Sequence, residues 1–371
     1  MKIKEQLHTL TPYQPGKSMD EVKRELGLEK ITKLASNENP FGCSEQVKIA
    51  VTKQIEKAST YPDGYATDLR KKLSNHLQIG EKQLIFGNGS DEVIQMVCRS
   101  LLYSGKNTVM ATPTFPQYKH NATIEGAEVR EIPLDNEGNH DLIAMLNAID
   151  ENTAVVWLCS PNNPTGTYIS NEQLEAFINQ VPSTTLVVID EAYCEYATAS
   201  DYPNTIKLLT SYKNVLITRT FSKVYGLASF RIGYGISTED FIKKIEPVRE
   251  PFNGNSFAQV AATAAIGDQL FIKNCVQKNK EGLSQYYTFC NENNLNYYPS
   301  EGNFILIDVE EDSDVVFQYL LQHGYIVRSG KALGFPTHLR ITVGTHNQNE
   351  EIITILSDYI RQTEGNAKYY A

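Results

Sequence analysis

The most informative stretch of the chain reads Thr220-Phe221-Ser222-Lys223-Val224-Tyr225-Gly226-Leu227-Ala228-Ser229-Phe230-Arg231. It follows the apolar run 215–218, which predicts a buried strand, and it places two hydroxyl residues directly before one lysine. Thr220 and Ser222 can donate hydrogen bonds to phosphate oxygens, and Arg231 can make a bidentate charge-assisted contact with the same phosphate. The amine of Lys223 can form an imine with an aldehyde. The stretch therefore predicts a strand end that holds a reactive amine beside a bound phosphate.

A lysine imine and a phosphate clamp are needed together by one cofactor, pyridoxal 5′-phosphate. Taken alone, a lysine after a strand is usually a solvated surface residue, and S-x-K strings recur by chance, so the hypothesis depends on partners elsewhere in the chain.

A second apolar run reads T-L-V-V-I-D-E-A-Y from Thr185 to Tyr193 and predicts a buried parallel strand that ends on Asp190. A buried carboxylate is costly unless it is paired, and a protonated pyridinium nitrogen is a suitable partner. The hydroxyl group of Tyr193 can donate a hydrogen bond to the 3′-oxygen of the same ring.

A third strand is predicted at 154–159, and it leads into Ser160-Pro161-Asn162-Asn163-Pro164-Thr165-Gly166. The Asn-Pro and Thr-Gly pairs mark a tight loop, in which the amide of Asn163 can donate to the 3′-oxygen of the ring. Phe115, in Thr112-Pro113-Thr114-Phe115, can stack on a planar cofactor. The alternatives are an ordinary turn for the loop and core packing for Phe115.

A phosphate cradle is predicted where 84–87 leads through Gly87-Asn88-Gly89 into an apolar helix at 93–102. We expect Ser90 and Asp91 to cap this helix, whose first N–H groups face an anion. The glycines resemble part of a dinucleotide-binding motif, but Glu92 occupies the position of its third glycine and disfavours that interpretation.

Composition limits the classes of function. The 371 residues are 41% apolar and 21% charged, as in ordinary globular proteins, and suggest two domains. A formal charge of −10 argues against nonspecific binding to nucleic acid. No apolar stretch approaches the roughly 20 residues that span a bilayer, and the polar start, without a signal-peptide core, predicts a cytoplasmic protein.

The potential metal ligands are dispersed. The six cysteines form no C-x-x-C pair and lie mostly in apolar segments, and the seven histidines show no H-E-x-x-H motif. We therefore expect reduced, buried cysteines without disulfide bonds and no bound metal.

Strands alternate with helical patterns from about 80 to 240, which predicts an α/β fold with a mostly parallel sheet covered by helices. The pattern changes after Glu246, where an Ala-rich helix at 257–266 precedes a long helix that ends near 293. Strands at 304–309 and 339–343 then predict a smaller α+β domain. All four motifs lie at strand ends, where open α/β sheets bind ligands.

The four motifs N-G-S-D-E, S-P-N-N-P-T-G, V-I-D-E-A-Y and T-F-S-K-x-x-x-L-x-x-x-R, in this order, resemble those of the fold-type I pyridoxal-phosphate aminotransferases. The segments 10–16, 34–42, 326–330 and 339–344 are similar to histidinol-phosphate aminotransferases, and the resemblance extends from about residue 10 to 360. It implies an N-terminal arm and small-domain segment at 1–45, a large cofactor-binding domain at 46–250 and a C-terminal small domain at 251–371.

The same resemblance assigns substrate contacts. Arg340, on an apolar strand, is costly to bury unless it is paired, and the family implies that it binds the α-carboxylate, with a structural salt bridge as the alternative. By resemblance, Arg328 and Tyr13 hold the phosphate of histidinol phosphate. Tyr61 matches a tyrosine that reaches the cofactor phosphate of the other subunit in a homodimer.

The resemblance implies a transaminase of histidine biosynthesis that interconverts histidinol phosphate and 2-oxoglutarate with imidazole acetol phosphate and glutamate. In this mechanism Lys223 binds the cofactor and then moves a proton. An aromatic-amino-acid aminotransferase and a phosphoamino-acid decarboxylase of the same fold are the alternatives. A cofactor-binding regulator without chemistry is disfavoured by the joint presence of Lys223 and Asp190.

Overall fold

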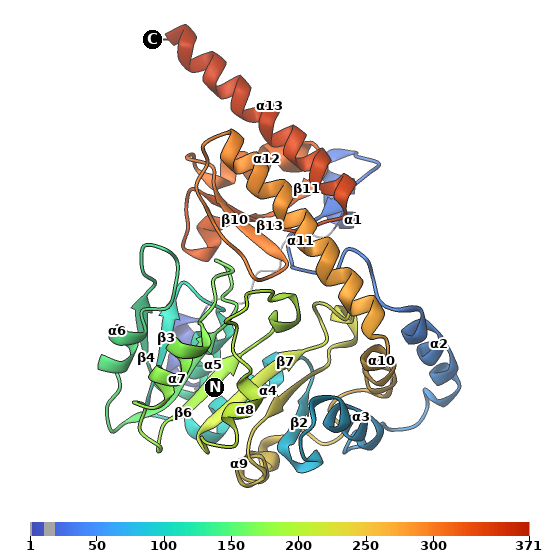
Figure 1. Cartoon of the computed structure of the whole chain (residues 1–371), viewed down its shortest axis with the longest axis vertical. Helices are drawn as coiled ribbons and strands as arrows, with labels where there is room; N and C mark the ends of the chain where they lie inside the picture. Colours follow the sequence, from blue (N-terminus) through green and yellow to red (C-terminus); the bar gives the residue numbers. More distant parts are fainter. Residues whose placement is uncertain (1, 11–18, 371) are drawn as a thin grey trace.

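A seven-stranded sheet is the base of the computed structural model, which describes residues 2–10 and 19–370 (Figure 1). Its strands, in their order across the sheet, are β2 (Leu84–Gly87), β8 (Gly233–Ile236), β7 (Val215–Thr220), β6 (Leu186–Asp190), β5 (Thr153–Cys159), β3 (Asn107–Thr112) and β4 (Glu128–Pro133). Only β8 runs antiparallel to its neighbours. The prediction of a mostly parallel sheet is confirmed.

The register of the central strands aligns three of the predicted motifs. Cys159 of β5 pairs with Asp190 of β6, and Asp190 pairs with Thr218 of β7. Parallel strands end at the same edge of a sheet, so the segments that follow β5, β6 and β7 emerge side by side.

Helices cover both faces of this sheet, and successive apolar residues of each strand therefore point into different cores. Val187 and Ile189 belong to one apolar cluster and Val188 to the other. The first face is covered by α2 (Glu45–Gln54), α3 (Thr67–Leu77), α6 (Leu142–Asn147), α7 (Asn171–Ile178), α8 (Thr205–Leu208) and α10 (Ser256–Gly267), and the second by α4 (Ser90–Leu101), α5 (Gln117–Glu125) and α9 (Glu239–Ile245).

The smaller part is built on an antiparallel sheet. Its order is β12 (Arg328–Ser329), β13 (His338–Thr342), β10 (Phe304–Asp308) and β9 (Tyr297–Tyr298), as the expected α+β unit requires. A separate short pair joins β1 (Thr32–Lys33) to β11 (Tyr325–Ile326) and so brings the N-terminal segment to this part. The remaining helices are α1 (Met19–Leu26), α11 (Gln269–Glu292), α12 (Ser313–Gln322) and α13 (His346–Tyr370).

The two parts are joined by α11, which leads from α10 into the smaller part (Figure 1). Its neighbour α10 packs with small alanine side chains against the helices of the large sheet, and residues Ile272 and Cys275 of α11 belong to the same apolar cluster. The division of the chain at 45 and 250 stays a prediction.

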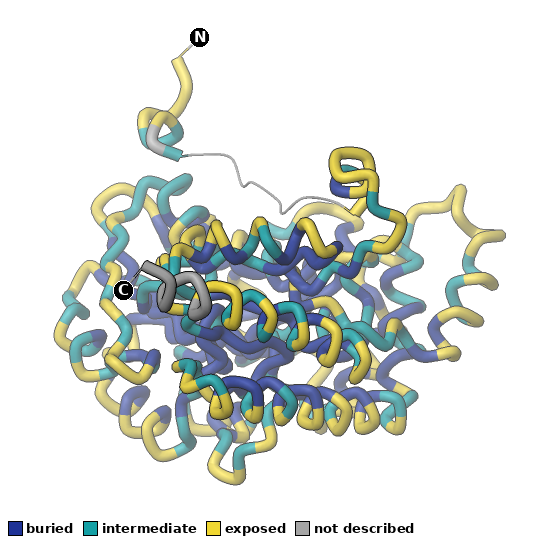
Figure 2. The backbone as a smooth tube through the Cα atoms, turned by 90° about the horizontal axis from the view of Figure 1, so that it is seen from above, coloured by how far each residue is buried: buried dark blue, intermediate teal, exposed yellow. Residues whose placement is uncertain are grey.

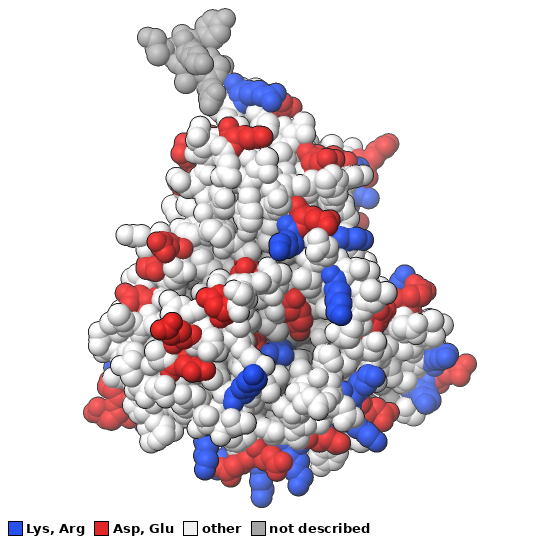
Figure 3. Space-filling view, in the orientation of Figure 1, with Lys and Arg blue, Asp and Glu red and all other residues white. Residues whose placement is uncertain are grey.

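Buried backbone lies in the middle of the molecule, and exposed turns lie around it (Figure 2). On the face drawn in Figure 3, acidic and basic side chains are interspersed without a broad basic surface. In residues 2–10 and 19–370, no helix is long and apolar enough to cross a membrane.

Candidate active site

A cavity of about 310 Å³ lies where the carboxyl ends of β5, β6 and β7 face the smaller sheet. It brings together nearly every side chain that the sequence predicted for the site. The predicted residues that line it are Ser90, Asp91, Phe115, Asn163, Asp190, Tyr193, Thr220, Ser222, Lys223, Arg231, Arg328 and Arg340. Tyr61 does not line the cavity, and Tyr13 lies outside the described residues.

Asp190 lies at the end of β6 with 3% of its surface exposed. The hydroxyl group of Tyr118 donates a 2.5 Å hydrogen bond to Oδ2, whereas Oδ1 has no partner at hydrogen-bond distance among the described residues. Burial raises the pKa of Asp190 to about 6, and the hydrogen bond from Tyr118 opposes that rise. A cationic ligand group at Oδ1 would complete the pairing that the buried carboxylate requires.

Lys223 is half-buried in the turn after β7, and its Nζ donates a 3.3 Å hydrogen bond to the backbone oxygen of Ser36. Burial and the nearby Arg340 lower the pKa of the amine to about 8. A lowered pKa increases the neutral, nucleophilic fraction of a lysine at physiological pH. The amine is therefore prepared for attack on a carbonyl group.

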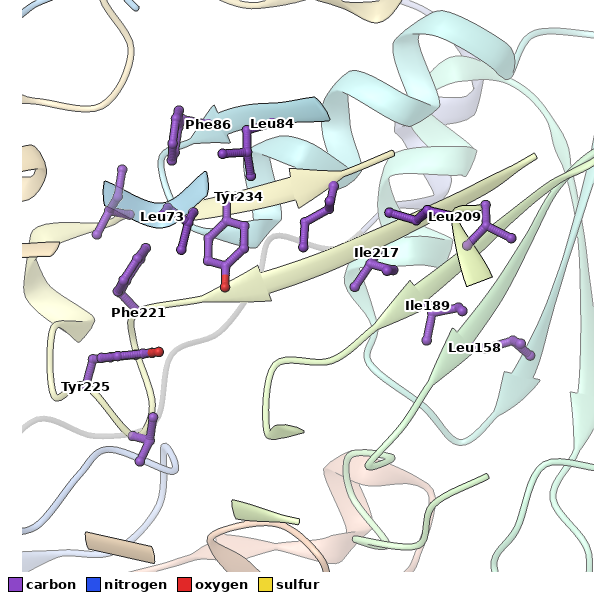
Figure 4. Close-up of a cluster of buried hydrophobic side chains, with 14 of the residues drawn as sticks. Leu73, Leu84, Phe86, Leu158, Ile189, Leu209, Ile217, Phe221, Tyr225 and Tyr234 are labelled. Carbon is purple, nitrogen blue, oxygen red and sulfur yellow. The ribbon is translucent and has the colours of Figure 1, made fainter. Parts of the chain in front are cut away.

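The turn that carries Lys223 is anchored in the core. Phe221 and Tyr225 lie next to each other with ring centroids 4.9 Å apart, and the ring of Phe221 also packs 5.5 Å from that of Tyr234 (Figure 4). The three side chains are buried. Phe221 precedes Lys223 in the sequence and Tyr225 follows it, so packing in the core determines the position of the turn.

The start of α4 forms the other end of the cavity with Ser222 and Arg231. Nη1 of Arg231 lies 3.4 Å from the hydroxyl oxygen of Ser222, and Nη2 pairs with Asp91 at 3.1 Å. A Cβ atom at Gly89 would lie 2.6 Å from Nη2 of Arg231 and would displace the guanidinium group, and the φ of 79° also favours glycine here.

The predicted caps of α4 are wrong. Gly89, with φ of 79°, is the N-cap residue and offers no side chain, while the carboxylate of Asp91 turns to Arg231. Gly89, Ser90 and Asp91 nevertheless line the cavity, and the first turn of a helix offers free N–H groups to an anion.

Tyr193 is held by Asn37, a residue for which the sequence alone predicts no role in the site. The amide of Asn37 donates a 2.9 Å hydrogen bond to the Tyr193 hydroxyl, and Oδ1 of Asn37 accepts one from Thr342 of the smaller sheet. Burial raises the pKa of Tyr193 to about 12, and Arg340 and Asn37 oppose this rise. The segment around Asn37 was recognised by its motif, but nothing in the motif points to Tyr193.

Tyr118 was also missed. It is fully buried, stacks on Trp157 with centroids 4.8 Å apart and meets Phe115 edge-on at 5.6 Å. Phe115 thus both packs in the core and lines the cavity, so the two interpretations of this ring are compatible.

The two predicted substrate arginines lie directly opposite each other on neighbouring antiparallel strands, Arg328 on β12 and Arg340 on β13. Arg340 is 6% exposed and donates 2.6 Å hydrogen bonds to Oδ1 of Asn163 and to the backbone oxygen of Ala35. Like charges placed opposite each other across a sheet repel. An anionic ligand between them would relieve that repulsion.

Tyr61 lies away from the cavity, with 82% of its surface exposed, and stacks on the half-exposed ring of Phe252 at 4.9 Å. Two exposed aromatic rings of this kind are typical of a protein–protein contact.

The residues of the cavity fit pyridoxal 5′-phosphate. The unpartnered oxygen of Asp190 suits a pyridinium nitrogen, the α4 terminus with Ser222 and Arg231 suits a phosphate, and the Lys223 amine suits an aldehyde. Within the described residues, no group of three or more His, Cys, Asp or Glu side chains is arranged to hold a metal ion.

Comparisons with known proteins agree with this chemistry. The family described as "Aminotransferase class I and II" matches residues 29–356. Histidinol-phosphate aminotransferase of Geobacillus sp. (strain WCH70) is 62% identical over 98% of this chain and 100% of its own length. The same enzyme of Bacillus subtilis (strain 168) is 60% identical over 97% of this chain and 100% of its own length.

A solved structure also covers nearly the whole chain. Histidinol-phosphate aminotransferase from Sinorhizobium meliloti, in complex with pyridoxal 5′-phosphate, superimposes with a TM-score of 0.89 over 98% of both chains at 27% identity. From the family match and the identity to its relatives over their full length, the chain belongs to the histidinol-phosphate aminotransferases of the class I and II aminotransferase family.

Proposed function

We propose that this protein is the transaminase of histidine biosynthesis that interconverts histidinol phosphate and 2-oxoglutarate with imidazole acetol phosphate and glutamate, with pyridoxal 5′-phosphate as its cofactor. The observation that carries the proposal is one cavity in which a buried carboxylate with an unpartnered oxygen, an amine of lowered pKa and two opposed arginines meet. The relatives named above support the substrate pair.

When bound, pyridoxal 5′-phosphate supplies the electron sink that stabilises negative charge on the substrate carbon. The carboxylate of Asp190 would pair with the ring nitrogen of the cofactor, and its negative charge would keep that nitrogen protonated. The hydroxyl group of Tyr193 and the amide of Asn163 orient the oxygen side of the ring. Nζ of Lys223, with a pKa near 8, can take up and return the proton of the substrate carbon that carries the amine.

The two arginines divide the recognition of substrates. We assign the phosphate of histidinol phosphate to Arg328, which is half-buried at the edge of the smaller sheet. We assign the α-carboxylate of glutamate to Arg340, which contacts Asn163 of the large part. Histidinol phosphate has no α-carboxylate, so a site that serves both substrates needs both cations.

The proposal includes a homodimer in the cytoplasm. Tyr61 is too exposed to serve the cavity of its own subunit, and its stacking on Phe252 presents an aromatic surface to a partner. In the dimer we place the Tyr61 hydroxyl against the phosphate site of the other subunit.

Replacing the lysine tests the chemistry. Lys223→Ala should abolish the covalent link to the cofactor, so that borohydride reduction followed by denaturation leaves no cofactor attached to the chain, and should reduce turnover by at least about 10²- to 10⁴-fold. Its Tm without cofactor should stay near that of wild type, because the substitution removes only one side-chain hydrogen bond among the described residues, the 3.3 Å contact with the backbone oxygen of Ser36. Wild-type turnover by Lys223→Ala would disprove the assignment.

Separate alanine substitutions should distinguish the arginines. Loss of a charge-assisted hydrogen bond costs about 1.5–3 kcal/mol, roughly 10- to 150-fold. Arg328→Ala should raise KM for histidinol phosphate by this factor and affect phenylalanine, which lacks a phosphate, much less. Arg340→Ala should weaken glutamate and phenylalanine most.

Each half-reaction is followed by the absorbance change of the cofactor, so that one variant is compared with itself on two substrates. Equal losses for histidinol phosphate and phenylalanine in Arg328→Ala would contradict the phosphate assignment. Wild-type turnover of threonine phosphate with release of CO₂ would favour the decarboxylase alternative instead.

Mixing inactive chains should reveal the shared site. A dimer of one Tyr61→Ala chain and one Lys223→Ala chain contains one site with both native residues, so random exchange should restore roughly a quarter of the sites. The matched control mixes Asp190→Ala with Lys223→Ala chains, whose defects both lie in the cavity of their own subunit, and should restore nothing. If both parent variants are strongly impaired, no recovery of activity after verified subunit exchange would count against the crossing of Tyr61.

A further inference from the structure

A buried ion pair lies directly behind the site. Glu191 follows Asp190, and Arg219 precedes Thr220, but neither residue lines the cavity. Their side chains are 1% and 15% exposed. Nε and Nη2 of Arg219 lie 2.8 and 2.7 Å from the same carboxylate oxygen of Glu191.

The pair connects all three strand ends that carry the site. The backbone N–H of Glu191 donates to the oxygen of Thr218 on β7 at 2.9 Å. The hydroxyl group of Tyr202 donates to the backbone oxygen of Ser160, at the start of the Asn163 loop, at 2.7 Å and lies 3.4 Å from Glu191. One network thus links the ends of β5, β6 and β7.

Stability alone does not explain such a pair. Removing two charges from water is expensive, and apolar residues of similar volume are often equally stable or better in the same place. Two hydrogen bonds from a planar guanidinium group to a carboxylate define both a distance and an orientation. Here they define them between the end of β6, which carries Glu191, and β7, which carries Arg219.

We propose that Glu191 and Arg219 are positioning residues, which fix the separation of Asp190 from the Thr220–Lys223 turn. They thereby keep the sites for the ring nitrogen, the cofactor phosphate and the Lys223 amine at constant distances from one another. This proposal rests on the proposed function. Errors of about 1 Å in these distances can cost about 100-fold in rate. Substrate binding depends on arginines of the smaller sheet, so the effect should fall on kcat and cofactor affinity and spare KM.

A matched pair elsewhere provides the control. In Arg249–Glu246, Nε and Nη2 each lie 2.8 Å from one carboxylate oxygen, with side chains 13% and 32% exposed, and neither residue lines the cavity. Arg219→Lys and Arg249→Lys keep the charge and lose the planar guanidinium group. Both should lower the Tm of the cofactor-free protein by similar amounts.

Only Arg219→Lys should raise the Kd for pyridoxal 5′-phosphate, by about tenfold, and lower kcat for histidinol phosphate by about 10- to 100-fold, with KM within about threefold of wild type. Equal effects of Arg219→Lys and Arg249→Lys on kcat and cofactor Kd would overturn the proposal. If wild type and Arg249→Lys bind cofactor but turn over no histidinol phosphate, the proposed function fails, while the comparison of cofactor Kd still tests the positioning role.

A double substitution guards against simple loss of folding. Glu191→Leu with Arg219→Met removes both charges of the pair. Arg219 also lies near Glu195, and burial raises the pKa of Glu195 to about 7, so this carboxyl group can take up a proton once Arg219 is absent. The double variant should have a higher Tm than Glu191→Leu or Arg219→Met alone. Its kcat should nevertheless stay reduced and its Kd for the cofactor should stay raised. Recovery of Tm, kcat and Kd together would assign the pair to stability alone.

Discussion

The buried carboxylate of Asp190 is the constraint on which the site depends. It ends a strand that is covered on both faces, in register with Cys159 and Thr218, so its position follows from the packing of the sheet. Tyr118 satisfies one oxygen, the other has no hydrogen-bond partner among the described residues, and Asp190 lines the cavity. Since burial raises its pKa to about 6, the charged form is costly until a cation joins it, which makes the folded protein selective for a protonated ring.

The remaining groups divide between the two parts of the molecule. The large part contributes Asp190, Lys223 and the start of α4 to the cavity, whereas the smaller sheet contributes Arg328 and Arg340, to which we assign the substrate anions. Asn37 belongs to the segment that joins the parts, since it contacts Tyr193 on one side and Thr342 on the other. The hydrogen bonds of Asn37 therefore connect the smaller sheet to a residue that lines the cavity.

Much of this arrangement could be predicted from the sequence because the site lies at strand ends. A strand buried on both faces is a continuous apolar run, and the polar residues that interrupt it, such as Asp190 and Lys223, mark the edge where ligands bind. Tyr118 and Asn37 escaped prediction because their partners lie 72 and 156 residues away, and no local pattern encodes such contacts. The cap of α4 was wrong because Asp91 had a stronger partner in Arg231. The crossing of Tyr61 requires a second subunit and stays a prediction.

The most direct test of the central claim is the affinity of cofactor-free Asp190→Asn for pyridoxal 5′-phosphate, measured by absorbance titration near pH 8 together with Tm. Asparagine keeps the hydrogen bond to Tyr118 and removes the charge. The pKa of Asp190 in the folded protein is about 6, above the ordinary value of 3.8. Ionisation of this carboxyl group therefore lowers the stability of the cofactor-free protein as the pH rises from 3.8 to about 6. We expect Asp190→Asn to have an equal or higher Tm without cofactor but to bind the cofactor about 10- to 150-fold more weakly. Affinity equal to that of wild type would contradict it.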